Sequence, residues 1–533
     1  MTFRLALVVT GLAGYIALSY EMVWFRVYGF LTGGAPSSFG VMLGAYLLGI
    51  AFGSLFAGKI CSHTSGTSGS ASSDDRDTLQ RLRWPAGLVL ASTLCSFALA
   101  PAVAHLVTFA SYAFSLAAVA LAAGLMGAIL PLIAHFGIAV DAAVGERLSY
   151  LYLANIVGSV VGSLLTGFVL MESLPLASIS SLLMVLGVML SSVLWWASCK
   201  DPVPKAVGAM LLPLVAAIGA MAGPTLHDGL YEKLMYKKKY TADTRFAHVV
   251  ENRSGVITVS PDGAIFGGGM YDGVFNTDVI NDRNLIVRAY ALLGLPRKTG
   301  RVLMIGLSSG SWAQVLAHLP GTTDVTVVEI NPGYPKLTAQ FAETKSLLTN
   351  PKVHIVFDDG RRWLRAHPTE KFDTILQNTT WHWRGNITDL LSLDYLQLVK
   401  AHLNPHGLFI YNTTWSETAQ KTGCSTFKHG LRLINFLYLS DDPVVLDRDL
   451  WRQGLRDVVI DGRKIFDLNQ PFHRARLDEI VRFADQSTYG PNGGQAETCA
   501  KLVERTLHTP MVTDDNMLTE WVRKWYQVPT AGD

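Results

Sequence analysis

The sequence predicts a two-part chain: an N-terminal α-helical membrane domain of about seven helices, followed by a doubly wound α/β domain that opens with a small β unit. Charge density is the first observation, because residues 1–223 hold nine Lys or Arg and eight Asp or Glu, against 44 and 42 in all 533 residues. The second is the alternation of short apolar strands with helical segments from residue 300 onward, which is typical of parallel sheets. We therefore expect a transmembrane domain at 1–223, a small β unit with a linker at 224–298, and an α/β domain with a C-terminal extension at 299–533.

The overall composition excludes several classes of protein. Half of the residues are apolar and 16% are charged, whereas soluble domains average about 25% charged, so a wholly soluble enzyme and a disordered chain are excluded. A net charge of +2 gives no reason to expect a nucleic-acid partner. Five cysteines are too few for a disulfide scaffold, and their spacing predicts no metal site.

Seven long apolar stretches in the first part predict the membrane helices. Each approaches or exceeds the roughly 20 residues needed to cross a hydrocarbon core, and continuous apolar runs satisfy their backbone groups in lipid as helices. The stretches are 5–32, 36–61, 85–108, 110–138, 149–171, 176–197 and 205–223. The apolar region of the first is too long for a cleavable signal peptide. The Ser/Gly-rich stretch at 62–83 is predicted to be a flexible linker.

Individual residues within these stretches predict local features. Pro131 and Pro213 lie inside the fourth and seventh stretches and predict a kink or a break in each helix. Glu21 and Arg26 are ionisable groups at membrane depth, where charge is costly, so they suggest either a functional pair on one helix side or an arginine that reaches the interface. Small residues recur at spacing four and predict close helix packing, namely Gly49 with Gly53 and Gly158 with Gly162.

The loop charges leave the orientation in the membrane open. Basic residues near alternate ends of the stretches place the N-terminus in the cytosol, namely Arg4, Lys59, Arg76, Arg81, Arg83, Arg147, Lys200 and Lys205. Seven crossings would then put the polar half outside, whereas the basic cluster of Lys233 and residues 237–239 favours the cytosolic side. A seventh stretch that does not cross, or a broken 110–138 stretch, would reconcile the two. We expect an integral protein of a bacterial inner membrane whose polar half is cytosolic.

The second half predicts a nucleoside-binding sheet. Residues 245–275 hold short alternating runs with glycine turns, which suggest a small antiparallel β unit. Five strands are predicted over 301–306, 324–330, 353–357, 372–377 and 407–412, with helices over 312–319 and 334–347.

Ligands bind at the carboxyl ends of such strands. There the first strand enters a GLSSG turn (306–310) ahead of a helix N-terminus, the second ends in Glu329, suited to a ribose diol, and the third ends in DDG (358–360). A sheet with an altered or empty pocket is the alternative.

These motifs resemble those of the spermidine synthase family, within the wider fold of S-adenosylmethionine-dependent transferases. The resemblance covers residues 245–420 and rests on YDG (271–273), VLMIGLSSGS (302–311), VVEINP (327–332), FDDGRRWL (357–364), FDTILQN (372–378) and LLSLDYLQLVKAHLNPHGLFIY (390–411). It implies a Rossmann-like fold that binds S-adenosylmethionine or its decarboxylated form as donor, without a metal. The residues matching its donor site are Gly306, Ser308, Gly310, Glu329, Asp359 and Gly360. Ser308 stands where a glycine is usual, and Asp359 is the residue expected to contact adenine.

The resemblance extends to both ends of the chain. ALSYEMVWFR (17–26), YLLGIAFGSLFAG (46–58) and YLANIVGSVVGSLLTG (152–167) are similar to the membrane domain of fused, membrane-bound spermidine synthase-like proteins. VTDDNMLTEW (512–521) resembles their C-terminal signature.

The acceptor side departs from the family pattern. The family's acidic motif after the fourth strand, of the DSSDP type, binds and deprotonates the amine, whereas this chain reads NTTWHWRG (378–385), with Asn378 and Trp381 at the places of its two acids. Neither Asn nor Trp can act as the base that an amine nucleophile needs. Asn276 takes the place of the Gln expected after the YDG stretch, whose Asp272 is a candidate substrate contact. The Tyr-His-Glu run that helps hold the polyamine is replaced near LIVRA (285–289).

The rewritten stretch offers other candidates. Trp381 and Trp383 could face a cation or line an apolar acceptor pocket, with simple packing as the alternative. His382 is a candidate general base near neutral pH, or a structural histidine, and Arg384 could clamp a carboxylate or phosphate. Two further acids are alternatives to the lost ones, namely Asp389 and Asp394.

Two functions follow from this sequence. The first is a membrane-anchored transferase that passes an aminopropyl, methyl or related group to an amine or a lipophilic acceptor; the sulfonium donor makes the neighbouring carbon electrophilic, so orientation is the main requirement. The second is a transporter-like or scaffold membrane protein whose polar half is a non-catalytic nucleoside-binding domain, which the lost acids and the Gly-to-Ser change favour. The expected partners are the lipid bilayer, the small-molecule acceptor and, as one option, a second copy in a homo-oligomer. Nucleic acid is not among them.

Overall fold

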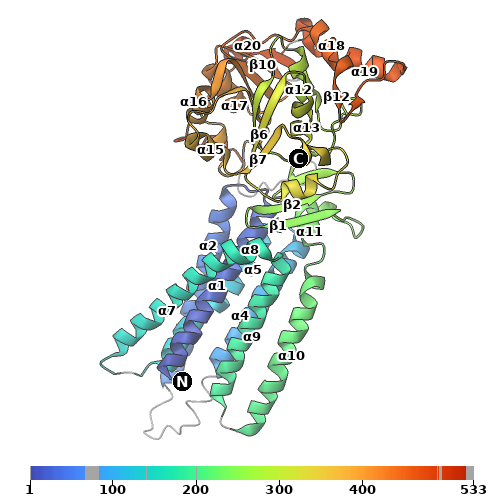
Figure 1. The fold of residues 1–533 in the computed structure, drawn as a ribbon. Coiled ribbons are helices and arrows are strands. Elements are labelled where there is room, and N and C mark those ends of the chain that lie inside the picture. Colours follow the sequence, from blue (N-terminus) through green and yellow to red (C-terminus); the bar gives the residue numbers. More distant parts are fainter. Residues whose placement is uncertain are drawn as a thin grey trace. The chain divides into compact units, whose positions relative to one another are not determined.

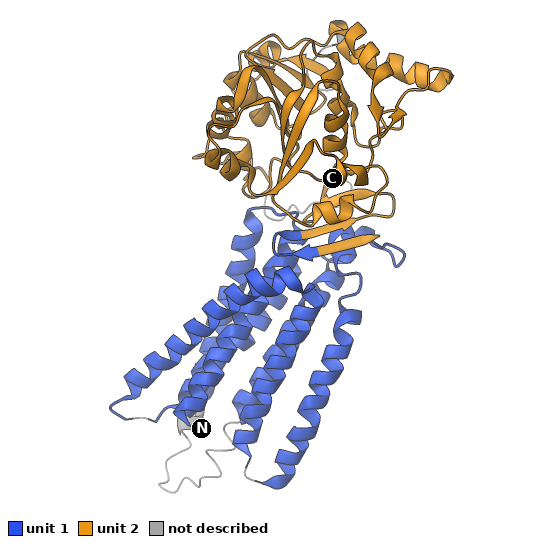
Figure 2. Cartoon of the chain, viewed as in Figure 1, with its two compact units in different colours: residues 1–245, 251–255, 525–533 blue, residues 246–250, 256–524 orange. Residues whose placement is uncertain are grey.

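The computed structural model describes residues 2–66, 83–139, 141–199, 201–488, 490 and 495–523. They form two compact units (Figure 2): residues up to 245 together with 251–255 belong to unit 1, and residues 246–250 with those from 256 to 523 belong to unit 2. The stretch predicted to be a linker at 62–83 lies outside the described residues except at its two ends.

Unit 1 consists of long apolar helices (Figure 1). They are α1 (Phe3–Leu31), α2 (Ser37–Gly66), α4 (Arg83–Leu106), α5 (Ala113–Gly127), α6 (Ile129–Gly137), α7 (Val144–Leu164), a π-helical turn (Leu165–Leu170), α8 (Met171–Ser173), α9 (Leu176–Ser198), α10 (Pro202–Leu226) and the short α11 (Leu230–Tyr236). Within the described residues, seven spans are long and apolar enough to cross a membrane by length and composition. They coincide with the seven predicted stretches.

The repeated small residues lie where helices meet, as predicted. A Cβ atom added to Gly53 of α2 would lie 1.8 Å from the carbonyl oxygen of Gly124 in α5, and one added to Gly158 of α7 would lie 1.8 Å from that of Gly11 in α1. Similar clashes follow at Gly49 and Gly162. Any side chain at these places would push the helix backbones apart, which explains the spacing of four.

The two prolines differ in effect. Pro131 lacks the N–H that would bond the Gly127 carbonyl, and the helix is interrupted there, since α5 ends at Gly127 and α6 begins at Ile129. The Ser54 hydroxyl donates to the Gly127 carbonyl at 3.0 Å, which satisfies the freed acceptor. By contrast, α10 continues through Pro213 for 25 residues in all, so no break occurs there, as neighbouring groups allow for proline in apolar helices.

Arg26 reaches the end of its helix instead of pairing with Glu21. Its guanidinium donates to the Arg253 carbonyl at 3.2 Å. Nearby, the Glu251 carboxylate accepts from the Leu176 backbone N–H at 2.9 Å and from the Tyr231 hydroxyl at 2.8 Å. These residues all belong to unit 1. Among the described residues Arg26 forms no ion pair with Glu21, and its place at a membrane interface stays a prediction.

A small sheet opens the polar half. Its strands are β1 (His248–Asn252), β2 (Gly255–Val259), β3 (Ala264–Gly267) and β4 (Met270–Val274), in the order β1-β2-β3-β4. β2 with β3 and β3 with β4 pair antiparallel. The small antiparallel β unit predicted over 245–275 is confirmed.

The main sheet of unit 2 has the order β14-β10-β11-β9-β8-β5-β6-β7. Its parallel strands are β5 (Gly300–Ile305), β6 (Thr322–Glu329), β7 (Val353–Phe357), β8 (Phe372–Gln377) and β9 (Leu403–Asn412). Three antiparallel strands extend it, namely β10 (His429–Leu433), β11 (Phe436–Ser440) and β14 (Ala496–Thr498). The five predicted strands are confirmed, whereas the three antiparallel ones were not foreseen.

Helices cover both faces of this sheet. Alternate residues of β5 enter different apolar clusters, with Val302 and Met304 in one and Leu303 and Ile305 in the other, because successive side chains of a strand point to opposite faces. The helices include α13 (Ser311–His318), α14 (Tyr334–Thr338), α15 (Gly360–Ala366), α16 (Leu393–Ala401), α17 (Glu417–Thr426), α18 (Arg448–Asp457) and α20 (Cys499–Arg505). A doubly wound, Rossmann-like sheet is therefore present.

One helix is shorter than predicted. The expected helix over 334–347 ends at Thr338, and a 3₁₀ turn follows at Lys345–Thr349. Between them the Thr344 hydroxyl donates to the Thr338 carbonyl, so a side chain takes an acceptor that a longer helix would use.

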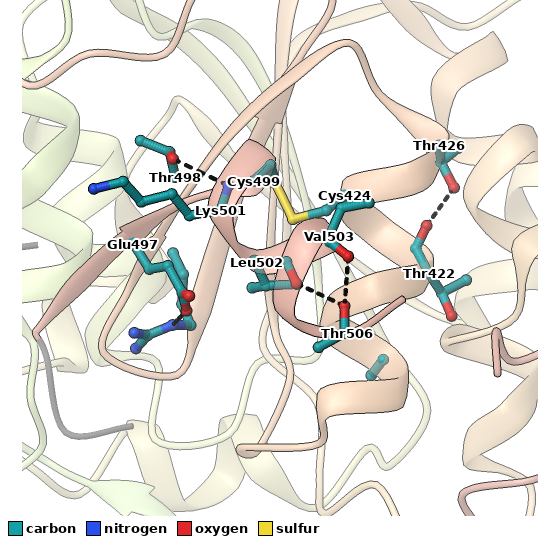
Figure 3. Close-up of a disulfide and its surroundings, with 12 residues drawn as sticks. Thr422, Cys424, Thr426, Glu497, Thr498, Cys499, Lys501, Leu502, Val503 and Thr506 are labelled. Carbon is teal, nitrogen blue, oxygen red and sulfur yellow. Dashed lines mark hydrogen bonds and ion pairs between the residues drawn. A yellow bond between two sulfur atoms is a disulfide. The ribbon is translucent and has the colours of Figure 1, made fainter. Parts of the chain in front are cut away.

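A disulfide joins α17 to α20 (Figure 3). It links Cys424 to Cys499 across 75 residues of sequence. The low cysteine count argued against a disulfide scaffold, and this single bond was missed because nothing in the spacing of two cysteines shows that they meet.

Candidate functional site

The turn after β5 has the backbone shape that the glycine motif predicted. Gly306 and Gly310 have φ of +88° and +80°, and Ser308 between them has φ of +52°. Glycine adopts such angles freely, while a serine must be held in them. The Ser308 hydroxyl donates to the Asp272 carbonyl of β4 at 2.7 Å, so the unusual serine ties the turn to the small sheet.

Glu329 ends β6 directly beside this turn and is 3% exposed. Its two carboxylate oxygens accept from the backbone N–H groups of Leu307 at 2.6 Å and Asn331 at 2.8 Å. Burial raises the pKa of Glu329 to about 7. Two carboxylate oxygens offer about four acceptor positions, so acceptor capacity is left for a ribose hydroxyl. The ribose role of Glu329 stays a prediction.

Asp359 and Gly360 begin α15 after β7. The Asp359 carboxylate accepts from the Arg362 N–H at 2.8 Å and so caps the helix. A Cβ on Gly360 would lie 2.6 Å from the Ile305 side chain, so this glycine lets α15 approach β5. The adenine role of Asp359 stays a prediction beside these structural ones.

The C-terminal segment 512–521 binds the start of α15, directly after the same turn. Arg361 binds both carboxylate oxygens of Asp514, at 2.8 and 2.5 Å, and Asp389 lies 3.5 Å from Arg361. The Asp394 carboxylate accepts from the Asp514 N–H at 3.2 Å. Asp389 and Asp394 thus serve the C-terminal segment, and neither lines the cavity described next.

A cavity of 230 Å³ lies at the carboxyl ends of β8 and β9. Its walls come from β4, residues 283–288, the turn after β8, the turn after β9 and Asn435. The lining residues are Tyr271, Asp272, Arg283, Asn284, Leu285, Arg288, Asn378, Thr379, Thr380, Trp381, Asn412, Thr414, Trp415 and Asn435. Of the predicted site residues, Asp272, Asn378 and Trp381 are thus brought together here.

Asp272 forms a buried cluster with Tyr334 and Arg384. The Tyr334 hydroxyl donates a short hydrogen bond to the Asp272 carboxylate, and Arg384 donates to the Thr380 hydroxyl at 2.7 Å. Burial raises the pKa of Asp272, although the Tyr334 hydroxyl and the Arg384 charge act against this. Burial likewise lowers the pKa of Arg384. The cluster engages Arg384 inside the protein, beside the cavity.

Three predicted residues face elsewhere. Trp383 is 2% exposed, and the Arg523 guanidinium lies 4.0 Å from the centre of its ring, so Trp383 packs instead of lining the cavity. The Asn276 side chain donates to the Asn281 carbonyl at 3.0 Å and accepts from the Asp278 N–H at 2.8 Å, which holds its own loop.

His382 is the third. Its ring Nδ1 lies 2.8 Å from the Thr414 hydroxyl. Burial lowers the pKa of His382 to about 4, so the ring is neutral and weakly basic at pH 7. This differs from the expectation of a base that titrates near neutral pH, because desolvation disfavours the charged imidazolium.

Sequence reasoning missed half of the cavity wall. Asn412 is the last residue of β9 and Trp415 lies in the turn that follows; the sequence located this strand without assigning its end a role. Arg288 falls inside the LIVRA stretch, which had been noted solely for the residues it lacks. The available signal was its position, since the resemblance to the spermidine synthase family implies substrate contacts from that stretch.

Comparisons with known proteins support the resemblance. No family model matches the chain. It is 25% identical over 308 residues to the polyamine aminopropyltransferase of Mycobacterium tuberculosis, covering 55% of this chain and 57% of that protein. Polyamine aminopropyltransferase 1 of Streptomyces coelicolor is 25% identical over 258 residues, covering 44% and 47%. The chain therefore spans about half the length of the curated relatives it matches.

Among solved structures, the spermidine synthase of Thermotoga maritima aligns with a TM-score of 0.34 and 15% sequence identity, over 44% of this chain and 84% of that one.

Proposed function

We propose that this chain, a spermidine synthase-like protein, is a membrane-anchored transferase. It binds S-adenosylmethionine or its decarboxylated form and passes an aminopropyl, methyl or related group to a small acceptor. The observation that carries the proposal is the order of the glycine turn, Glu329 and Asp359 at three neighbouring strand ends. The relatives named polyamine aminopropyltransferase support the reaction class, and the seven apolar spans support the anchor.

On the donor side, the chain's own residues would bind and orient. The turn through Gly306 and Gly310 leads into the N-terminus of α13, whose N–H groups favour acceptor atoms of a ligand. Glu329 would hold the ribose diol, and Asp359 would contact the base. When bound, the sulfonium of the donor supplies an electrophilic carbon.

On the acceptor side, positioning takes the place of base catalysis. Asn378 and Trp381 cannot accept a proton, and His382 is a weak base. The acceptor must therefore arrive as a competent nucleophile, and the cavity would contribute by holding it close to the donor. Among the described residues lining the cavity, Asp272 is the single acid.

The test is donor binding by the full chain in detergent. S-adenosylmethionine, its decarboxylated form and methylthioadenosine would be titrated by calorimetry into wild type, Glu329→Gln and the control Glu343→Gln, an exposed acid outside the site. We expect saturable binding of at least one compound, weakened about 10-fold or more by E329Q and unchanged by E343Q. Absence of binding to all three would overturn the proposal.

A second candidate is a non-catalytic binding domain on the extracytoplasmic side. The Cys424–Cys499 disulfide favours it, because disulfides persist in oxidising compartments. The free cysteines within the described residues, Cys61, Cys95 and Cys199, all belong to unit 1.

The number of apolar spans also favours the extracytoplasmic side for unit 2. Seven crossings from a cytosolic N-terminus would put unit 2 outside, and long domains cross largely regardless of charge, so the basic cluster at 237–239 is weak evidence against it. The transferase proposal needs the cytosolic side, where the adenosyl donor is made.

Two reporters at the C-terminus decide between the candidates. Green fluorescent protein folds in the cytosol, and alkaline phosphatase becomes active outside it. Fluorescence without phosphatase activity, with Cys424 and Cys499 reactive to a thiol reagent after denaturation, would support the transferase. The reverse pattern would support the extracytoplasmic binding domain.

A further inference from the structure

We propose that the cavity binds the oxyanion of a small molecule through Arg288, with Trp381 and Trp415 holding an apolar or flat body. The acceptor would then be a carboxylate- or phosphate-bearing molecule and not a polycationic amine. Calling this ligand an acceptor rests on the proposed function; its binding does not.

Arg288 is a buried cation that forms no ion pair with any described carboxylate. It sits on the short helix α12 (Val287–Tyr290), is 7% exposed and lines the cavity. Its guanidinium lies 4.4 Å from the centre of the Phe436 ring and 5.3 Å from that of Trp312. Among the described residues, none places a carboxylate within ion-pair distance of it, and a buried charge left in this state is costly.

Its hydrogen bonds leave donors unused. Nε donates to the Leu285 carbonyl and Nη2 to the Asn284 carbonyl, both at 2.8 Å, and Nη1 makes a short bond to the Asn435 side chain. A guanidinium carries five N–H groups, so two are left for a ligand. Its planar fork suits a carboxylate or phosphate.

The other charges of the lining are already matched. Arg283 pairs with Asp262 at 2.7 Å. Asp272 accepts from Tyr334 and faces the Arg384 charge. Outside the lining, the Asp282 carboxylate also acts on the Arg288 charge and accepts from the backbone N–H groups of Asn284, Ile286 and Val287. Within the lining, the charge without an ion-pair partner is that of Arg288, and it attracts an anion.

A chain of amides extends this polarity across the cavity. Asn435 accepts from Arg288 and donates to the Asn412 side-chain oxygen at 2.9 Å. Asn412 in turn donates toward the Asn378 side-chain oxygen at 3.5 Å. With its oxygen so engaged, Asn378 can present its NH₂ group, where the family's acid would present a carboxylate. The replacement turns an acceptor of amine protons into a donor to oxygen.

Two indoles supply the apolar wall. Trp381 lies in the turn after β8, and Trp415 lies in the turn after β9, where Thr414 and Trp415 have φ of +43° and +67°. Non-glycine residues are rarely held in such angles. The turn thus holds a half-exposed indole at the cavity, as a ligand with a flat body would require.

The experiment compares two probes with one body and opposite charge. Phenylacetate and phenethylamine, with spermidine as the family-type amine, would be titrated into the full chain in detergent. We expect phenylacetate to bind at least about 10-fold more tightly than either amine. Tighter binding of spermidine or phenethylamine, or no binding of phenylacetate, would overturn the proposal.

Variants locate the site. Arg288→Gln should weaken phenylacetate about 10-fold or more, whereas Arg452→Gln, on α18 and away from the cavity, should leave it unchanged. Because Arg288 also ties loops together, Asn378→Asp gives an independent test, since it adds a negative charge without removing a buried cation. It should weaken phenylacetate by a similar factor; unchanged binding in N378D would refute the site. None of these results depends on a donor, so failure of the transferase proposal would be seen separately, as absence of adenosyl-compound binding.

Discussion

The turns after β5 and β8 form two sides of one predicted site, yet they differ in kind. The turn after β5 has Gly306, Gly310 and the neighbouring Glu329 in the expected places, with Ser308 where a glycine is usual, and its groups are engaged by backbone hydrogen bonds. The turn after β8 carries an amide and an indole, Asn378 and Trp381, where the resemblance to the spermidine synthase family implies acids, and it lines a cavity. The difference teaches that backbone geometry can be retained on one side of a site while the side-chain chemistry of the other is replaced.

Substituting Gly306 in the turn after β5 should have the largest effect on stability. Gly306→Ala places a Cβ 2.6 Å from the Asn378 carbonyl at φ of +88°, so we expect a loss of roughly 2–4 kcal/mol of unfolding free energy, seen as a lower thermal midpoint. The matched control is Gly462→Ala, between β12 (Val459–Ile460) and β13 (Arg463–Lys464), with φ of +78° and open space around it. Equal losses of unfolding free energy in G306A and G462A would show that the turn after β8 places no constraint on the turn after β5.

Glu329 should make stability depend on pH. Burial raises its pKa to about 7, above the unfolded value of about 4.3, so the native state binds the proton more tightly. Stability is then greatest below the unfolded pKa and falls as pH rises through about 7, by at most about 4 kcal/mol. Between pH 4 and 8, thermal midpoints of wild type and of E343Q should fall more than those of E329Q. Equal falls in wild type and E329Q would contradict this.

Breaking the ion pair between Asp514 and Arg361, beside the turn after β7, should have a smaller effect on stability. Asp514→Asn removes the charge that holds Arg361, whose side chain is 8% exposed while that of Asp514 is 40% exposed. Because Asp514 is partly in solvent, we expect roughly 1–3 kcal/mol of destabilisation. Asp515→Asn, an exposed neighbour, is the control. A D514N midpoint equal to that of D515N would show that this ion pair carries no stability.

Substituting His382 should have the smallest effect on stability and on ligand binding. Its pKa near 4 keeps the ring neutral, so His382→Gln loses one hydrogen bond, worth about 1 kcal/mol. We expect ligand binding between pH 6 and 8 to follow the wild-type profile. If ligand binding changed with pH near 6.5 in wild type but not in H382Q, His382 would be a titrating group of the site after all.

Much of the fold was predictable because its signals are local. Continuous apolar runs predicted the seven spans, and strand–helix alternation predicted five parallel strands. The three antiparallel strands were not predicted. For β10 and β11, pairing with distant strands determines the place in the sheet, and local periodicity does not show this. Pro213 shows the same limit, because a proline interrupts a helix or not according to what neighbouring groups can satisfy.

The sequence by itself determined the division by charge, the glycine turn and the acids at the neighbouring strand ends, because each is read from residue type and spacing. That catalytic acids are missing after the fourth strand is what the resemblance to the spermidine synthase family implies. Tertiary structure decided which residues meet: Trp415 instead of Trp383 beside Trp381, Arg288 without an ion pair to any described carboxylate, and Cys424 bonded to Cys499. Contacts between distant segments depend on how strands and helices pack, and no local pattern encodes which side chains turn inward there.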